Sequence, residues 1–222
     1  MAQTGTAGFL VDHLHGDAAR PNRGTVGLAK SVGANGPTLF ISVDRLTGWA
    51  WIPLPRDVSD LPSRIRTFVE AQPDSPWIGI GNPLPGIDGF RTSHRQAEQA
   101  RAVAIMSGSN PRRVIAAGEL GLPIAALVGD NIAAAGAWIT EALGPLASRT
   151  DSDERLRETL RVFLGTNSSF KAAAEKLHLH TNTVKYRVSR AIDRRGRPIT
   201  DDRLEVEVAL LLCHWFGTSV LG

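Results

Sequence analysis

Apolar residues occur in short runs over the first two thirds of the chain and recur at helical spacing over the last third. Short apolar runs bounded by turn-forming residues predict strands, and apolar residues three and four apart predict helices. Strands are expected at 8–11, 38–43, 48–52, 77–80 and 113–116, and helices of this part at 58–72, 92–107, 122–127 and 131–143. Strands interleaved with helices indicate an α/β layer with a covered sheet.

The pattern changes at residues 143–152, where Gly144, Pro145 and a polar run interrupt the helical spacing. Beyond this point the sequence has no strand signals, and four helices are predicted between Asp153 and Phe216. We therefore expect an α/β domain over 1–147 followed by an all-α domain over 148–222. The predicted fold class is α+β.

The two middle helices of the second domain form a helix-turn-helix pattern. The first of them starts after Ser168 or Ser169, either of which is a suitable N-cap. The break at 178–180 follows, and the second helix is expected to begin with Thr181 as its N-cap and to end near Arg195, before a glycine. Two short helices joined by a tight turn are typical of DNA-binding modules.

The second of these helices has the side chains of a DNA reader. Val184, Val188, Ala191 and Ile192 share one face and are expected to pack inward. The opposite side then presents Asn, Thr and Arg side chains, which recognise base edges, and a Tyr that binds phosphate. We expect DNA contacts from Ser168, Ser169, Thr181, Asn182, Thr183, Lys185, Tyr186, Arg187, Arg190 and Arg194.

Positive charge gathers in the same region. The formal net charge of the chain is only +3, but residues 171–197 carry eight basic and two acidic side chains. Such an island suits the neutralisation of DNA phosphates. Lys185, Arg190 and the cluster Arg194–Arg197 are the expected phosphate ligands, together with the backbone amides of 168–170 at a helix N-terminus. The alternative is a solvated, charged helix face.

Residues 180–187, His-Thr-Asn-Thr-Val-Lys-Tyr-Arg, resemble the HxNTVxYR core of the C-terminal helix-turn-helix in the PucR/CdaR family of bacterial transcription regulators. Segments 78–90 and 93–100 are similar to the GGDEF-like middle domain of that family, and the likeness extends over roughly residues 38–215. The family often has Arg where this chain has Thr181, so we do not expect the same target sequence.

The resemblance implies a ferredoxin-like fold for the α/β domain, promoter DNA as the partner and a response to a small-molecule effector. Members commonly carry a further N-terminal sensory domain, which this chain begins too late to contain. We therefore interpret the chain as a fragment or a short member. Reading two half-sites needs a homodimer, and the α/β domain is the expected place for self-association. Trp49, Trp51 and Trp77 are either its apolar patch or core residues.

Catalytic, metal-binding and membrane interpretations are weaker. A cyclase of the GGDEF type needs a Gly-Gly hairpin and paired carboxylates, and the hairpin 43–49 has neither, so we predict a degenerate domain and no enzyme. Structural zinc needs four ligands, mostly thiols. The two histidine pairs, 13/15 and 178/180, together with Cys213 do not supply them, so we expect no metal or cofactor.

The cellular compartment follows from composition. The chain lacks a run of ~18 apolar residues and a secretory pattern, so we expect a cytoplasmic protein with no membrane partner. Cys213 is the only cysteine and is expected to be a buried thiol. A non-catalytic module that binds a nucleotide or a protein is the alternative function.

Overall fold

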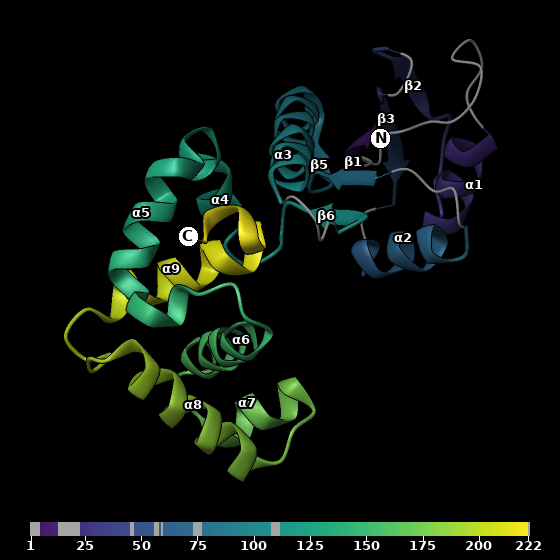
Figure 1. Ribbon diagram of the computed structural model, residues 1–222. Helices are drawn as coiled ribbons and strands as arrows, with labels where there is room; N and C mark the ends of the chain where they lie inside the picture. Colours follow the sequence, from purple (N-terminus) through teal and green to yellow (C-terminus); the bar gives the residue numbers. More distant parts are fainter. Residues whose placement is uncertain are drawn as a thin grey trace. The chain divides into compact units, whose positions relative to one another are not determined.

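The computed structural model of the chain describes residues 5–12, 23–44, 47–55, 58, 60–72, 77–107 and 112–221 (Figure 1). Contacts along the chain separate two compact units. The α/β unit holds the described residues up to Ile105 together with residues 112–126, and the helical unit holds residues 106–107 and 127–221. Each unit therefore has a hydrophobic core of its own.

One six-stranded sheet forms the centre of the α/β unit. Its strands are β1 (Gly5–Asp12), β2 (Leu39–Ser42), β3 (Thr47–Leu54), β4 (Trp77–Ile80), β5 (Leu84–Pro85) and β6 (Val114–Ala116). The order is β2-β3-β1-β4-β6, with β5 paired to β1. β1 is antiparallel to β3 and β4, β2 is antiparallel to β3, and β6 is parallel to β4. Strands β1 to β4 thus have the expected ferredoxin-like arrangement.

Helices cover both faces of this sheet (Figure 1). They are α1 (Arg23–Val32), α2 (Leu61–Glu70) and α3 (Gly86–Met106), and α4 (Leu122–Val128) leads into the helical unit. Alternate residues of a strand point to opposite faces. Ile52 and Leu54 of β3 accordingly join Leu28 of α1 in one core. Trp51 points the other way, where its ring stacks on Phe90 of α3 with centroids 4.8 Å apart.

Glycines let α3 approach β4 closely. A Cβ at Gly79 would lie 2.6 Å from the Ala97 carbonyl oxygen, and one at Gly81 would lie 1.9 Å from the Ser93 carbonyl oxygen. No real side chain tolerates such distances, so both positions require glycine for this packing. The Gly-x-Gly pattern of this segment therefore has a role in helix–sheet contact.

The strand predictions are confirmed, but some helix predictions need correction. Helix α1 is not among the helices predicted from the sequence, and it buries Val32 fully. Helix α3 begins at Gly86, ahead of the predicted start at residue 92. Ser59, close to the start of α2, lies outside the described residues. Asp60, which precedes that helix, makes no side-chain cap bond.

The helical unit contains the four helices that were predicted after residue 152. Its elements are η1 (Gly129–Asn131), α5 (Ile132–Leu143), η2 (Gly144–Ala147), α6 (Asp151–Gly165), α7 (Phe170–Leu177), α8 (Thr181–Arg195), α9 (Arg203–Phe216) and η3 (Gly217–Val220). Helix α6 packs against α7, α8 and α9, and α5 packs against α9 and η3. The core therefore draws on all five helices.

This unit begins earlier than the predicted domain boundary between residues 147 and 148. Ile139 and Leu143 of α5 are fully buried, and α5 contacts α9. The Ala142 carbonyl near the end of α5 accepts a hydrogen bond of 2.8 Å from Arg195 Nε in α8. Residues 127–147 therefore belong with the C-terminal helices, because their apolar face is buried there.

No single helix in the described part of the chain is long and apolar enough to cross a membrane. The bent pair Leu122–Val128 and Ile132–Ala147 meets the length and composition criteria only when its two helices are joined. In the second helix of this pair, Ala135, Ile139 and Ala142 are buried in the protein.

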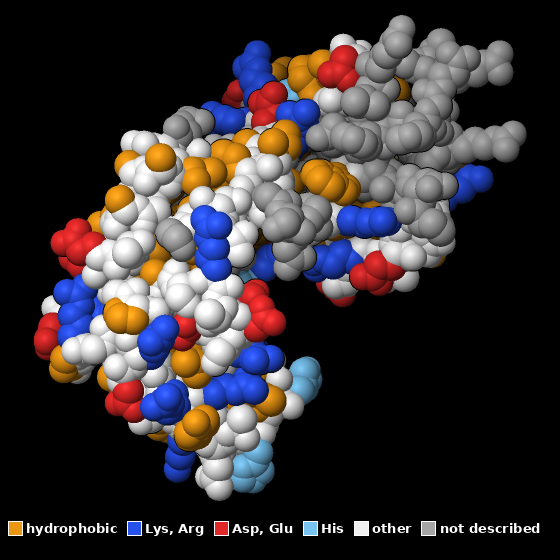
Figure 2. Space-filling model, in the orientation of Figure 1, with side chains coloured by type: hydrophobic (Ala, Val, Ile, Leu, Met, Phe, Trp, Pro, Cys, Tyr) orange, Lys and Arg blue, Asp and Glu red, His pale blue; other side chains and the backbone are white. Residues whose placement is uncertain are grey.

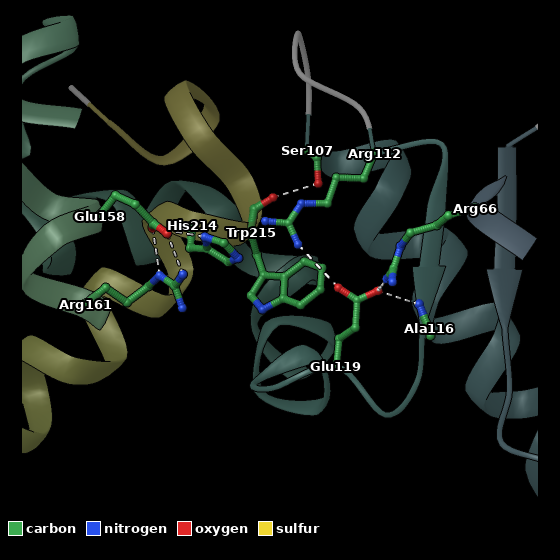
Figure 3. A network of polar contacts seen from close by, with 9 residues as sticks. All are labelled: Arg66, Ser107, Arg112, Ala116, Glu119, Glu158, Arg161, His214 and Trp215. Atoms are coloured by element: carbon green, nitrogen blue, oxygen red, sulfur yellow. Dashed lines mark hydrogen bonds and ion pairs between the residues drawn. The ribbon is translucent and has the colours of Figure 1, made fainter. Parts of the chain in front are cut away.

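A polar network joins α6 to α9 within the helical unit (Figure 3). The Glu158 carboxylate accepts hydrogen bonds of 2.8 and 2.6 Å from Arg161, and its Oε2 lies 3.3 Å from His214 Nδ1. Burial raises the pKa of this carboxyl, but the hydrogen bonds from Arg161 and His214 outweigh that effect and lower the pKa from 4.5 to about 2. The ionised carboxylate is therefore favoured in the folded state.

Replacing Glu158 by Gln should reduce stability in a pH-dependent way. The folded pKa lies below the unfolded one, so the contribution is present above about pH 4.5 and is lost as the pH falls toward 2. The side chain is 40 % exposed, so we expect a loss on the order of 1 kcal/mol at neutral pH. Urea unfolding of both proteins at several pH values measures this difference. A difference that stays constant as the pH falls would contradict the assignment.

Candidate nucleic-acid interface

Helices α7 and α8 form the helix-turn-helix. Ser169 caps α7, because its Oγ accepts a hydrogen bond of 3.2 Å from the Ala172 amide, which confirms one of the two predicted caps. The chain leaves α7 through His178, which adopts the left-handed conformation with φ 53°. The amides of His178 and Leu179 donate back to carbonyl groups at the end of α7. These bonds hold the turn at the short length that the sequence predicted.

The cap of α8 differs from the prediction. Thr181 is the first residue of the helix, and the N-cap is His180. The His180 Nδ1 atom accepts a hydrogen bond of 3.2 Å from the Asn182 amide. A histidine ring nitrogen accepts the capping hydrogen bond that a Ser or Thr oxygen usually accepts. Because Ser and Thr are the ordinary capping residues, the sequence pattern selected the neighbouring threonine.

Packing decides which face of α8 meets solvent. Val184 and Ala191 are fully buried and Val188 is 4 % exposed, and α8 contacts both α6 and α7. Asn182 lies on the opposite side and is exposed, and Tyr186, one turn later, is 65 % exposed. The predicted division into a packed and an outward face is thus confirmed.

The other residues of α8 that we expected to contact DNA lie beside Asn182 and Tyr186. Lys185 and Arg190 are exposed, whereas Thr181, Thr183 and Arg187 are half-buried. The predicted residues of α8 therefore reach solvent to different extents, and Lys185 and Arg187 lie on opposite flanks of the outward face. Blue Lys and Arg side chains lie over this part of the helical unit in Figure 2.

Several cations on this surface have no carboxylate partner. Among the described residues, none of Lys171, Lys185, Arg187 and Arg190 makes an ion pair. Lys185 is nevertheless positioned, because its Nζ lies 5.8 Å from the centre of the Phe170 ring of α7, within cation–π range. Unpaired cations on an exposed face are suited to bind phosphate.

Arg194 lies on the same helix but has a partner inside the protein. Its Nε and Nη2 atoms donate to the Asp153 carboxylate of α6 at 3.2 and 3.4 Å. Burial raises the pKa of Asp153, but hydrogen bonds from Ser148 and Thr150 and the charge of Arg194 outweigh it, so the pKa lies below its ordinary value. Arg194 therefore holds α8 to the start of α6.

In the predicted phosphate cluster Arg194–Arg197, burial removes Arg195, and Arg197 has a partner inside the protein as Arg194 does. The Arg195 side chain is fully buried, pairs with Asp202 and donates to the carbonyl oxygens of Ala142 and Pro198. Arg197 lies 3.2 Å from Asp202 and donates to the Glu141 carbonyl oxygen at 2.8 Å. Both arginines satisfy buried or terminal carbonyl groups, a structural role that charge counting does not reveal.

The amides at the start of α7 also need correction. The Ser168 amide donates to the Phe163 carbonyl oxygen at 3.0 Å, and the Ser169 amide donates to that of Thr166 at 3.1 Å. Two of the three amides that we expected to bind phosphate are thus used within the protein. Ser168 itself is half-buried with φ 58°, a left-handed conformation that places the chain for the entry into α7.

The remaining candidate residues are the cysteine, the histidine pairs and a turn aspartate. Cys213 is buried, and burial raises the pKa of its thiol to about 11, so the expectation of a core thiol is confirmed. Within the described residues, no group of three His, Cys, Asp or Glu side chains is placed to hold a metal ion. The predicted pair His13 and His15 lies outside the described residues. Asp44 accepts a 2.7 Å hydrogen bond from the Thr47 amide and so holds the turn between β2 and β3.

The fold and this surface define a two-unit protein in which a ferredoxin-like unit is followed by a helix-turn-helix with a basic, outward-facing second helix. Residues 156–212 match the model of the PucR C-terminal helix-turn-helix domain, and residues 11–103 match that of the GGDEF-like domain. The chain therefore has the domain architecture of the PucR/CdaR family of bacterial transcription regulators.

Individual relatives share part of this chain. An uncharacterized protein of Mycobacterium tuberculosis is 38% identical over 143 residues, 63% of this chain and 32% of that protein. The purine catabolism regulatory protein of Bacillus subtilis is 31% identical over 70 residues, 32% of this chain and 13% of that protein. The match thus spans about a third of the length of the mycobacterial relative.

Among solved structures, a regulator of polyketide synthase expression from Bifidobacterium adolescentis superposes with a TM-score of 0.40 at 22% identity. The superposition covers 95% of this chain and 84% of that one.

Replacing Arg194 by Ala should destabilise the helical unit. The Asp153 side chain is only 6 % exposed and would lose its cationic partner, while Arg194 itself is 49 % exposed and partly screened. We therefore expect a loss of roughly 1–2 kcal/mol in the free energy of unfolding. The control Arg190→Ala removes the same charge from an exposed position and should stay within about 0.5 kcal/mol of the parent. Equal unfolding midpoints in urea for both variants would refute a structural role for Arg194.

Proposed function

We propose that this chain is a sequence-specific DNA-binding transcription regulator that reads the major groove with α8. One observation carries the proposal: the outward face of α8 combines exposed polar side chains with cations that have no carboxylate partner among the described residues. A solvated helix face is usually balanced by nearby acidic groups. Here the carboxylates Asp153 and Asp202 pair with Arg194, Arg195 and Arg197, whereas Lys185, Arg187 and Arg190 make no ion pair among the described residues.

Each side chain has a role that follows from its position. Asn182 and Tyr186 lie at the centre of the outward face, so Asn182 is placed to bind adenine and Tyr186 to bind a phosphate. Arg187 and Thr183 lie on one flank, suited to guanine and to a thymine methyl group. Lys185 is held against α7, where it meets the DNA backbone.

Phosphate contacts complete the proposed interface. Arg190 follows Lys185 on the helix, Ser168 and Ser169 precede α7, and Thr181 begins α8, and we assign phosphate contacts to these residues as well. Because its charge is balanced by Asp153, we assign Arg194 a smaller share of phosphate binding. These contacts fix position on the duplex without reading sequence.

We assign no catalytic step to the chain. The alternative is a non-catalytic module that binds a nucleotide or a partner protein through the α/β unit. The cations of α8 that have no carboxylate partner among the described residues favour DNA, because a nucleotide bound at the other unit would not require them.

A salt titration tests the proposal. Binding to a random-sequence duplex should weaken steeply with salt, and the variant Lys185→Ala, Arg187→Ala and Arg190→Ala should show a shallower slope, by up to ~0.9 for each phosphate that is no longer neutralised. Fluorescence anisotropy of a labelled duplex measures both slopes. A matched control, Lys30→Ala, Arg91→Ala and Arg95→Ala, removes the same charge from the α/β unit and should leave the slope unchanged. Equal slopes for the two variants would remove DNA from α8.

We further infer that the regulator acts as a homodimer, since one α8 reads one half-site. Of the three tryptophans of the predicted patch, Trp51 is a core residue at 5 % exposure, whereas Trp49 and Trp77 are half-buried. Exposed apolar side chains lie instead on β2 and just after it: Leu39 and Val43 are 50 % exposed and Ile41 is 43 % exposed. Among the described strands β2 has a neighbour on one side only, and residues 37–43 carry no charge. An uncharged strand edge is a site for pairing with a second copy.

Replacing Ile41 by Lys should weaken self-association, because a buried ammonium would face its own copy across the pair. Sedimentation velocity over a range of protein concentrations measures the effect. The control Ile87→Lys introduces the same charge at a 73 % exposed position on α3 and should behave like the parent. A parent that stays monomeric at high concentration, or an Ile41→Lys variant that associates like the control, would disprove the β2 interface.

A further inference from the structure

His180 enters α8 with two of its groups bonded to the helix. Its carbonyl oxygen accepts from the amides of Thr183 and Val184 at 2.9 and 3.2 Å. Its ring Nδ1 accepts from the Asn182 amide at 3.2 Å, with the backbone of His180 in the extended region. The residue therefore closes the first turn of α8 and sets the position of Asn182, which begins the outward face.

The capping bond also determines where the ring carries its proton. A nitrogen that accepts a hydrogen bond has no hydrogen, so the single proton of the neutral imidazole lies on Nε2. The side chain is exposed, and its Nε2–H donates to no group in the described part of the chain. The turn thus presents the Nε2–H donor of His180, which has no partner in the described part of the chain, beside the residues that we assign to DNA.

We propose that His180 is a further DNA contact, in which Nδ1 caps α8 and Nε2–H donates to a backbone phosphate. This inference rests on the proposed function of α8. A phosphate is the expected acceptor, because the partial positive charge at the start of a helix favours an anion there. The contact is made by a neutral ring, so it positions the helix without adding to counterion release.

Two substitutions of His180 by residues with an amide side chain test the roles of the two ring nitrogens one at a time, without changing the charge. An asparagine oxygen lies near the position of Nδ1, so His180→Asn keeps the cap, and asparagine is among the best N-cap residues. Its amide nitrogen is too short to reach the position of Nε2. A glutamine nitrogen reaches that position, but glutamine is a poor cap, so His180→Gln keeps the donor and loses the capping bond.

The two variants should therefore show opposite effects: His180→Asn should lose DNA affinity but not stability, and His180→Gln should lose stability but little DNA affinity. His180→Asn should unfold at the same urea concentration as the parent but bind a labelled random-sequence duplex roughly tenfold more weakly. His180→Gln should unfold at a lower urea concentration and stay within about threefold of the parent in DNA affinity. Neither should change the salt slope of binding, in contrast to the loss of a cation.

His178 supplies the matched controls. It is exposed in the same turn but makes no ring hydrogen bond with a described residue, so His178→Asn and His178→Gln should bind DNA like the parent. Parent-like DNA affinity in His180→Asn would overturn the phosphate contact. Equal urea midpoints for the Asn and Gln variants of His180 would overturn the cap.

A measurement on the free protein keeps this inference separate from the proposed function. Long-range proton–nitrogen correlation spectra of the histidine rings should show His180 with its proton on Nε2. A spectrum with the proton on Nδ1 would overturn the assignment even if the chain binds DNA. If the parent binds no duplex at low salt, the DNA function fails, and with it the phosphate contact, while the spectrum still decides the cap.

Discussion

The burial of one apolar stripe of α8 decides which side chains this helix presents to solvent. Val184, Val188 and Ala191 are almost completely removed from water by α6 and α7. Burying an aliphatic side chain contributes about 1.5–3 kcal/mol, so rotating the helix about its axis would be costly. Side chains on the opposite face follow from this constraint by helix geometry alone. The surface of Asn182 and Tyr186 is therefore as rigidly oriented as the core beneath it.

Buried carboxylates divide the basic residues of this region into two groups. Asp153 and Asp202 are poorly exposed, and each needs a cation nearby because an unpaired buried charge is strongly destabilising. Arg194, Arg195 and Arg197 meet that need and connect α8 to α6 and α5. Lys185, Arg187 and Arg190, which lie further from these carboxylates along the helix, keep their charge for a partner. Arg194 and Arg195 of α8 thus stabilise the helical unit, while Arg187 and Arg190 of the same helix have no carboxylate partner among the described residues.

In the α/β unit, the main constraint is the close packing of helices on the sheet. Glycines at positions 79 and 81 allow α3 to cover one face of the sheet, and α1 and α2 cover the other. Coverage is complete around β3 but leaves the apolar side chains of Leu39, Ile41 and Val43 exposed at the edge. A unit that buries its core well and still exposes an uncharged edge is suited to association, which a reader of two half-sites requires.

The sequence by itself determined the division into an α/β and a helical part, the strands and the outward face of α8. These features depend on local periodicity, and periodicity is written directly in the order of residues. Tertiary structure alone decided that α5 belongs to the helical unit, because its partner α9 lies far along the chain. It also decided that Arg195 is buried, that Arg194 meets Asp153, and that His180 caps α8. Each of these depends on which atoms meet in space, and a count of charges or a list of preferred caps contains no such distances.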